Sequence, residues 1–155
     1  YFPYHQKIDE LIDSCRVRVA FDCHAMLPYG SGHQKDAGKA RPLICLGNNG
    51  DRHGRARKGS IATCSEAWIA ALAGRFRDEF GSEGPVAINN PFTGGFIANA
   101  HFWRKGVPWI QVEVNRALYE PDRPFAPGDL ETRGKARHLK ERIWRVLAGF
   151  AGDLW

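Results

Sequence analysis

The chain has 155 residues, of which 43% are hydrophobic and 25% charged, and its formal net charge is +5. These proportions are ordinary for a globular protein, and they exclude a wholly disordered or a fibrous chain. No stretch approaches the roughly 18 uninterrupted apolar residues of a membrane-spanning helix, so we expect no membrane partner. The mild positive charge permits an anionic ligand or a nucleic acid without requiring one. The length predicts one α/β domain over residues 1–155.

The chain opens Tyr1-Phe2-Pro3-Tyr4-His5, with neither a methionine nor the pattern of a signal peptide. We therefore expect a processed or partial polypeptide, whose site can be divided between this chain and residues outside it. The cysteines Cys15, Cys23, Cys45 and Cys64 have no CxxC spacing. They predict small buried side chains in a reducing compartment, and hence a cytoplasmic location.

Hydrophobic spacing predicts the elements of the first half of the chain. An apolar stripe with helical spacing predicts a helix over residues 5–16, and its members are Ile8, Leu11, Ile12 and Cys15. Short strands are expected at 17–21 and 43–46, and glycine-rich loops at 28–42 and 47–60.

The next helix is expected to begin at Thr63, because Thr63 and Glu66 form a capping-box pattern before an apolar run. Its apolar stripe is Trp68, Ile69, Leu72, Phe76 and Phe80, and Gly81 ends it. Strands follow at 85–88 and 109–114, with a turn at 89–95, a short helix at 115–119 and a loop at 121–128. A last helix over 131–150 is expected to turn Leu139, Ile143, Val146, Leu147 and Phe150 inward.

The predicted order is helix, strand, strand, helix, strand, strand, helix, and the strands are strongly apolar. This pattern predicts an α/β fold with a mostly parallel or mixed sheet and helices on both faces. In such sheets ligands bind beyond the carboxyl ends of the strands. Polar groups stand at or near three of these ends: Asp22 with His24, Asn89 with Gly94 and Gly95, and Gln111 with Glu113.

Asp22 and His24 are two residues apart in extended backbone, so both side chains face the same side. A histidine in this position is suited to bind a metal, with the carboxylate of Asp22 fixing its tautomer. The alternative is a strand-end histidine that only forms hydrogen bonds.

Gln111 and Glu113 share one face of an otherwise apolar strand. A buried carboxylate is costly unless it is paired or functional, which favours a general base with a raised pKa. The alternative is a glutamate on an edge strand that faces water. The two glycines of the 89–95 turn allow its backbone to approach a ligand closely, although on this segment alone a plain turn is the better explanation.

Three segments together resemble the N-formylglutamate amidohydrolase family: Asp22-Cys23-His24-Ala25-Met26, Asn89 to Gly95, and Gln111 to Tyr119. Tyr4-His5 before a helix and Ile44-Cys45-Leu46-Gly47 also look like that family. The family is similar in fold to the zinc carboxypeptidases, and its members hydrolyse N-formyl-L-glutamate to formate and glutamate in histidine breakdown. The resemblance implies a zinc-dependent hydrolase of a C–N amide bond that acts on an N-acyl amino acid.

Residue by residue, the resemblance implies that His24 is a zinc ligand and Glu113 the carboxylate that activates water. Asn89, Gly94, Gly95 and Arg116 are implied to shape the substrate pocket. Ala25 stands where the family usually has a serine, and only one of the usual three protein ligands of a catalytic zinc can be named. We therefore expect an upstream segment or another chain to complete the site.

Two other function classes remain open on the sequence. The first is a non-catalytic relative that serves as an interaction module, which the missing ligands favour. The second is a basic nucleic-acid-binding domain that uses residues 52–58 and the last helix. The basic side chains of that helix share it with an apolar stripe, so we expect a solvated outer face and no nucleic acid as partner.

Overall fold

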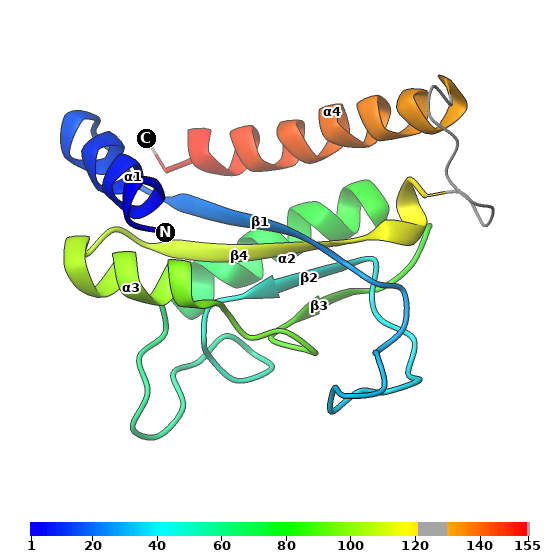
Figure 1. Cartoon of the computed structure of the whole chain (residues 1–155), viewed down its shortest axis with the longest axis horizontal. Helices are drawn as coiled ribbons and strands as arrows, with labels where there is room; N and C mark the ends of the chain where they lie inside the picture. The colour runs from blue at the N-terminus through cyan, green and yellow to red at the C-terminus, as the bar shows by residue number, and fades with distance from the viewer. Residues whose placement is uncertain (121–129, 155) are drawn as a thin grey trace.

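The computed structural model describes residues 1–120 and 130–154 (Figure 1). In this part of the chain, the helices are α1 (Phe2–Ser14), α2 (Glu66–Phe80), α3 (Phe96–Lys105), the 3₁₀ helix η1 (Arg116–Leu118) and α4 (Leu130–Gly152). The strands are β1 (Ala20–Met26), β2 (Ile44–Gly47), β3 (Val86–Ile88) and β4 (Trp109–Asn115). The loop expected at 121–128 lies outside the described residues.

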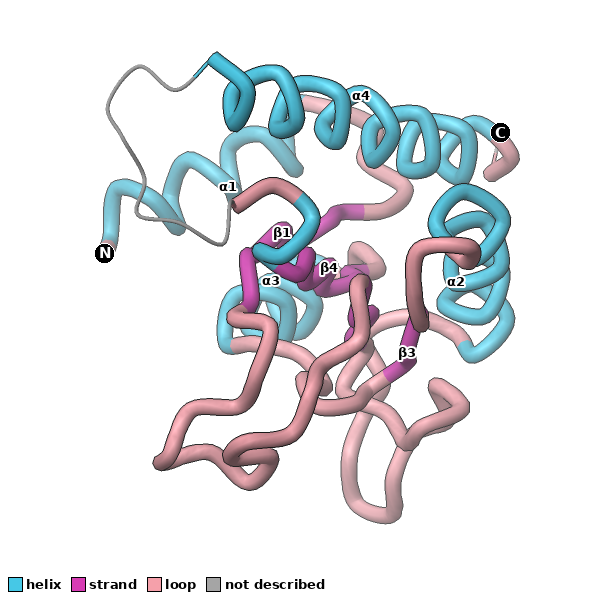
Figure 2. The backbone as a smooth tube through the Cα atoms, turned by 90° about the vertical axis from the view of Figure 1, so that its right-hand side faces the viewer, coloured by secondary structure: helices cyan, strands magenta, loops and turns pink. Residues whose placement is uncertain are grey.

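The four strands form one mixed sheet in the order β1-β4-β2-β3. β1 runs parallel to β4 and β2 parallel to β3, whereas β2 and β4 are antiparallel. Helices α2 and α4 pack against each other on one side of the sheet, and α3 lies on the other side with α1 against it (Figure 2). The predicted α/β class, with a mixed sheet and helices on both faces, is therefore confirmed.

The two faces of the sheet differ in chemistry because side chains alternate along a strand. One face of β4 carries Ile110 and Val112, which are fully buried in the core with α2. The other face of the same strand carries Gln111 and Glu113, which are also buried. The apolar face builds the core, and the polar face carries the candidate site.

Helix α2 begins two residues later than the capping pattern predicted. Its N-cap is Ser65, whose hydroxyl accepts a hydrogen bond from the backbone N–H of Trp68 at 3.2 Å. Thr63 is unavailable as a cap because its buried hydroxyl donates to the Trp109 carbonyl at 2.7 Å. A tertiary contact to β4 thus overrides the local capping signal.

Two further predictions about the elements were wrong. The first strand is Ala20–Met26 rather than 17–21, because it pairs with the whole of β4 from Trp109 to Asn115. Helix α3 was not expected, although Gly106 ends it in the left-handed conformation directly after two basic residues. That combination is a recognised helix-end signal.

Helix α1 does not bury its apolar stripe. Leu11 is 51% exposed and Cys15 is exposed, and the buried residue of α1 is Asp9. Asp9 contacts His101 Nδ1 through Oδ1 at 3.0 Å, and Arg104 through Oδ2 at 2.9 Å. Polar contacts with α3 therefore help to hold α1 in place, together with ring contacts such as that of His5 with Phe96.

Helix α4 buries the residues predicted for it. Leu139, Val146, Leu147 and Phe150 are at most 7% exposed, and Ile143 is half-buried against the same core. Part of its basic face is bound to α2, since Arg142 and Arg145 both contact the Glu79 carboxylate, at 2.7 and 3.3 Å.

The four cysteines are free thiols, but only two of them fit the prediction of small buried side chains. Cys45 and Cys64 are buried, whereas Cys15 and Cys23 are exposed. Among the described residues, no helix has the length and apolar character needed to cross a membrane.

Docking of α4 is tested by Leu147→Ala, which we expect to cost about 2–5 kcal/mol of stability because it leaves a cavity in the core. Trp144→Ala on the same helix is the matched control, because Trp144 is 68% exposed. Chemical denaturation measures both. An equal, small effect of the two changes would contradict the packing of α4.

Attachment of α1 is tested by Asp9→Ala, which removes the carboxylate shared by His101 and Arg104. We expect amide hydrogen exchange over residues 2–14 to accelerate about tenfold or more, while α2 keeps its protection. Glu10→Ala is the control, since the contacts of Glu10 with other described residues are to Lys7 and Gln6 on the exposed side of α1. Unchanged exchange in Asp9→Ala would show that other contacts hold the helix.

Candidate active site

The pairing of β1 with β4 places the polar residues of the two strands side by side. Asp22 is the register partner of Gln111, and His24 is the register partner of Glu113. Because the strands are parallel, all four side chains lie on the same face of the sheet. The structure therefore brings together the two constellations that the sequence placed at separate strand ends.

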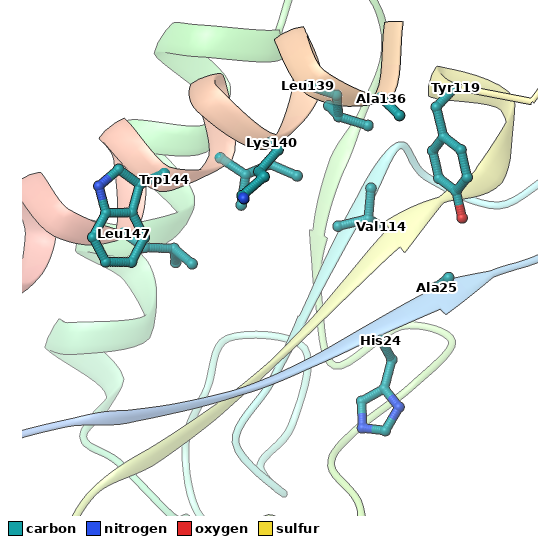
Figure 3. Close-up of a pocket in the computed structure, with 10 residues that line it drawn as sticks. His24, Ala25, Val114, Tyr119, Ala136, Leu139, Lys140, Trp144 and Leu147 are labelled. Carbon is teal, nitrogen blue, oxygen red and sulfur yellow. The ribbon is translucent and has the colours of Figure 1, made fainter. Parts of the chain in front are cut away.

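His24 is oriented by Asp22. Its Nε2 lies 2.9 Å from Asp22 Oδ1, and its side chain is 40% exposed while that of Asp22 is 7% exposed. The ring points away from α4, whereas Ala25 and Val114 stand on the α4 side (Figure 3). His24 is nevertheless one of the residues that line the apolar pocket under α4, which has a volume of about 400 Å³ and is otherwise lined mostly by α4 side chains. The contact with Asp22 occupies Nε2 and leaves Nδ1 for another partner.

Glu113 is a buried carboxylate on an interior strand, with β1 on one side and β2 on the other. The edge-strand alternative is therefore wrong. Burial raises the pKa of Glu113, and the negative charge of Asp22 adds to that rise, while His24 and Arg41 oppose it. The Gln111 side chain donates a hydrogen bond from Nε2 to Glu113 Oε1 at 2.8 Å. This bond fixes the carboxylate and leaves its second oxygen for a ligand.

The start of α3 closes one side of the cluster. A Cβ on Gly95, the N-cap of α3, would lie 3.6 Å from Asp22 Oδ2 and 3.8 Å from Gln111 Nε2. The Asp22 carboxylate therefore lies near the positive end of the helix dipole, which stabilises its charge. Asp22 Oδ2 and Gln111 Oε1 are buried acceptors without a hydrogen-bond partner in the described structure. Two unpartnered acceptors beside the histidine favour a ligand that brings a cation or hydrogen-bond donors.

Sequence reasoning missed Arg41. Its guanidinium is buried, lies 4.8 Å from the centre of the Phe92 ring, and carries a charge that lowers the pKa of Glu113. In the sequence, the one local sign of Arg41 is its position before Pro42 and an apolar strand. Cys45 is the register partner of Glu113 on β2, which the sequence did not indicate, and burial raises its pKa to about 11.

The remaining predicted site residues lie around this cluster rather than in it. The Asn89 side chain donates to Asn48 Oδ1 at 2.8 Å and to the Asp51 carbonyl at 2.6 Å, so it ties two loops together. Gly94 has a φ of 144° and packs against Asn49. Arg116 stands just beyond β4 and pairs with Glu120 at 2.6 Å. Of the predicted pocket residues, Gly95 is the one in contact range of the polar cluster.

The residues present fit part of a metal site. Among the described residues, His24 Nδ1 has no partner while Asp22 contacts Nε2, which is the arrangement usual for metal-binding histidines. In residues 1–120 and 130–154, however, no group of three His, Cys, Asp or Glu side chains could hold a metal ion. The cluster can thus supply one ligand and one base, while a full set of ligands requires groups from elsewhere.

Comparison with solved structures supports the fold. The chain is similar to the crystal structure of an N-formylglutamate amidohydrolase from Ralstonia eutropha, with a TM-score of 0.60 and 20% sequence identity. The match covers 94% of this chain and 51% of the other, so this chain spans about half the length of that protein. No curated protein matches the chain significantly.

A family model also matches the chain, and this match identifies the family as well as the fold. The model for N-formylglutamate amidohydrolase matches residues 1–120, which include Asp22, His24, Gly95, Gln111 and Glu113. The matched range is most of the chain and contains the whole polar cluster. The chain therefore belongs to the N-formylglutamate amidohydrolase family.

Proposed function

We propose that this chain carries the base and one metal ligand of a hydrolase that cleaves the C–N amide bond of N-formyl-L-glutamate. Water is consumed, and formate and glutamate are released. The observation that carries the proposal is the pairing of His24 with Glu113 in neighbouring strands, on the face of the sheet that also holds Asp22. Membership of the N-formylglutamate amidohydrolase family supports the choice of reaction.

The proposed cofactor is one zinc ion. His24 Nδ1 would hold it, and the contact between Nε2 and Asp22 would fix the tautomer and the orientation of the imidazole. The other ligands would come from a further segment or another chain. The site is accessible to such a segment, because β1 is an edge strand of the sheet and His24 is exposed on it.

Zinc bound here would supply a Lewis acid that polarises the amide carbonyl. Glu113 would accept a proton from the attacking water and pass it to the leaving nitrogen, which departs as the amine of glutamate. Its raised pKa makes it a stronger base than an exposed glutamate. The bond from Gln111 would hold one oxygen still, so that the other is aimed at the water.

The substrate would lie across the carboxyl ends of β1 and β4. Gly95 would allow close approach of the backbone, and Gly94 and Asn89 would fix the loop that carries it. Arg116 would meet a carboxylate of the substrate from the end of β4, in exchange for its contact with Glu120. The four free thiols favour a reducing, cytoplasmic location.

A non-catalytic relative remains the second candidate, and one observation favours it. The described residues do not by themselves form a three-ligand metal site. Such a protein would keep the sheet and the polar cluster as a docking module. Zinc content of the 155-residue chain, alone and together with candidate partner segments, separates the two functions.

The proposed roles are tested by Glu113→Gln and His24→Ala in the zinc-loaded, complete enzyme. Glu113→Gln should retain zinc and lose about 10²–10⁴-fold in formate release, because an amide cannot accept the proton of water. His24→Ala should lower the zinc content itself. Glu10→Gln on the exposed side of α1 is the control. Near-normal turnover by Glu113→Gln would contradict its role as the base.

The raised pKa of Glu113 also predicts a pH dependence of stability in the metal-free chain. When the pKa of a carboxyl group is higher in the folded chain than its unfolded value of about 4.3, the protonated group stabilises the fold at pH values below 4.3. This stabilisation is lost as the pH rises through the folded pKa. Glu113→Gln removes this titration. The midpoint temperature of unfolding of Glu113→Gln, relative to that of the wild type, should therefore increase as the pH rises from about 4 toward neutrality. If the midpoints of the two proteins change equally with pH, the raised pKa of Glu113 is contradicted.

A further inference from the structure

An apolar pocket lies between helix α4 and strands β1 and β4 (Figure 3). Its volume of about 400 Å³ is within the range of roughly 300–1,000 Å³ that is usual for small-molecule sites. Its most deeply buried walls are Leu139 and Leu147, which are each 7% exposed, and Val114 adds an apolar wall from β4. The described residues that line it include no carboxylate. We call this cavity the α4 pocket.

Two small side chains leave the α4 pocket open. Ala25 lines it from β1 and Ala136 from α4, and both residues are exposed. Two large rings stand at opposite ends of the pocket, that of Trp144 on α4 and that of Tyr119 after β4 (Figure 3). Trp144 is 68% exposed. A ligand that displaces water from these apolar walls would therefore gain free energy through the hydrophobic effect.

The rim of the α4 pocket is positively charged. Lys140 lines the pocket and lies between Ala136 and Trp144, one helical turn from each. Arg133 and Arg137 precede it on an adjoining row of the same helix. All three basic side chains are exposed, and none of them forms an ion pair with another described residue. The rim therefore attracts an anionic group.

Other basic residues of α4 are already paired. Arg142 and Arg145 contact the Glu79 carboxylate of α2, and Lys135 pairs with Glu131 at 2.8 Å. The basic run that the sequence shows in this helix thus divides into two parts. One part attaches α4 to its neighbours, and the other part gathers beside the apolar pocket.

We propose that the α4 pocket binds a free alkyl carboxylate of medium chain length. The alkyl chain would lie against Leu139, Leu147 and the Trp144 ring, and the carboxylate would pair with Lys140 at the rim. Sugars and nucleotides are excluded, because their polar groups would lose water and find no partners on the apolar walls. His24 is among the lining residues, but its ring points away from α4 (Figure 3). The proposed ligand is therefore separate from the proposed hydrolysis and does not rest on it.

Three probes test the two halves of this ligand by isothermal titration of the 155-residue chain. Decanoate should bind about tenfold more tightly than octanoate, because it buries two more methylene groups. Octanoate should bind about two- to fivefold more tightly than octanamide, which is the range of an exposed ion pair. Binding should also shift the tryptophan fluorescence to shorter wavelength, and Trp144→Phe should remove that shift.

Two substitutions with matched controls locate the binding site. Ala136→Phe fills the pocket and should weaken the binding of octanoate at least about tenfold, whereas Ala71→Phe on the exposed side of α2 should not. Lys140→Gln should abolish the preference for octanoate over octanamide. Lys58→Gln removes the same charge from the exposed 47–60 loop and should leave that preference unchanged. Circular dichroism confirms that each variant is folded.

Binding that strengthens with chain length and is lost in Ala136→Phe alone supports the apolar half of the proposal. A carboxylate preference lost in Lys140→Gln alone supports the charged half. No binding of octanoate or decanoate, or equal weakening by the two phenylalanine variants, would overturn the site. Binding to vesicles of anionic phospholipid without binding of the free acids would overturn it in favour of a membrane surface. A dimer that Ala136→Phe dissociates would assign the pocket to a second copy of the chain instead.

Discussion

The parallel pairing of β1 with β4 is the constraint on which the site depends. Side chains alternate along both strands, and the register sets Asp22 opposite Gln111 and His24 opposite Glu113. A shift of one residue would move every polar side chain of one strand to the core face. The core prevents that shift, because Ile110 and Val112 are fully buried on the apolar face of β4. The hydrophobic packing therefore fixes the chemistry on the opposite face.

The polar face of the sheet is divided into a covered half and an accessible half. At the start of β4, Trp109 stacks on His101 of α3, whose ring is bound by His5 at 2.9 Å and Asp9 at 3.0 Å from α1. Toward the end of the strand, Glu113 is paired with His24 of β1 and Cys45 of β2, the charge of Arg41 lowers its pKa, and His24 is exposed. The His101 ring in the covered half is thus held by side chains of α1. In the candidate site, His24 is exposed, whereas Asp22, Gln111 and Glu113 are buried beside it.

The sequence was sufficient to predict the α/β class and the residues of the polar cluster. Alternation along β4 identified Gln111 and Glu113, and the spacing of Asp22 and His24 placed them on one side of a strand. The sequence could not predict that Asp9 attaches α1. The burial of this carboxylate depends on His101 and Arg104 of α3, which are far from it in the sequence. Ser65 replaced Thr63 as the cap of α2 for the same reason, since the Thr63 hydroxyl is bound to β4. Arg41 was missed because its importance arises from Asp36, Phe92 and Glu113, which meet only in the fold.

The central claim is that Asp22 holds one nitrogen of His24 and leaves the other for a ligand. Long-range ¹H–¹⁵N NMR spectra of the histidine side chains measure this directly in the metal-free chain. We expect the proton of the neutral His24 ring to lie on Nε2 beside Asp22 and Nδ1 to be unprotonated, and we expect added zinc to shift the Nδ1 resonance most. A proton on Nδ1, or a zinc-induced shift confined to Nε2, would contradict the orientation on which the proposed site is built.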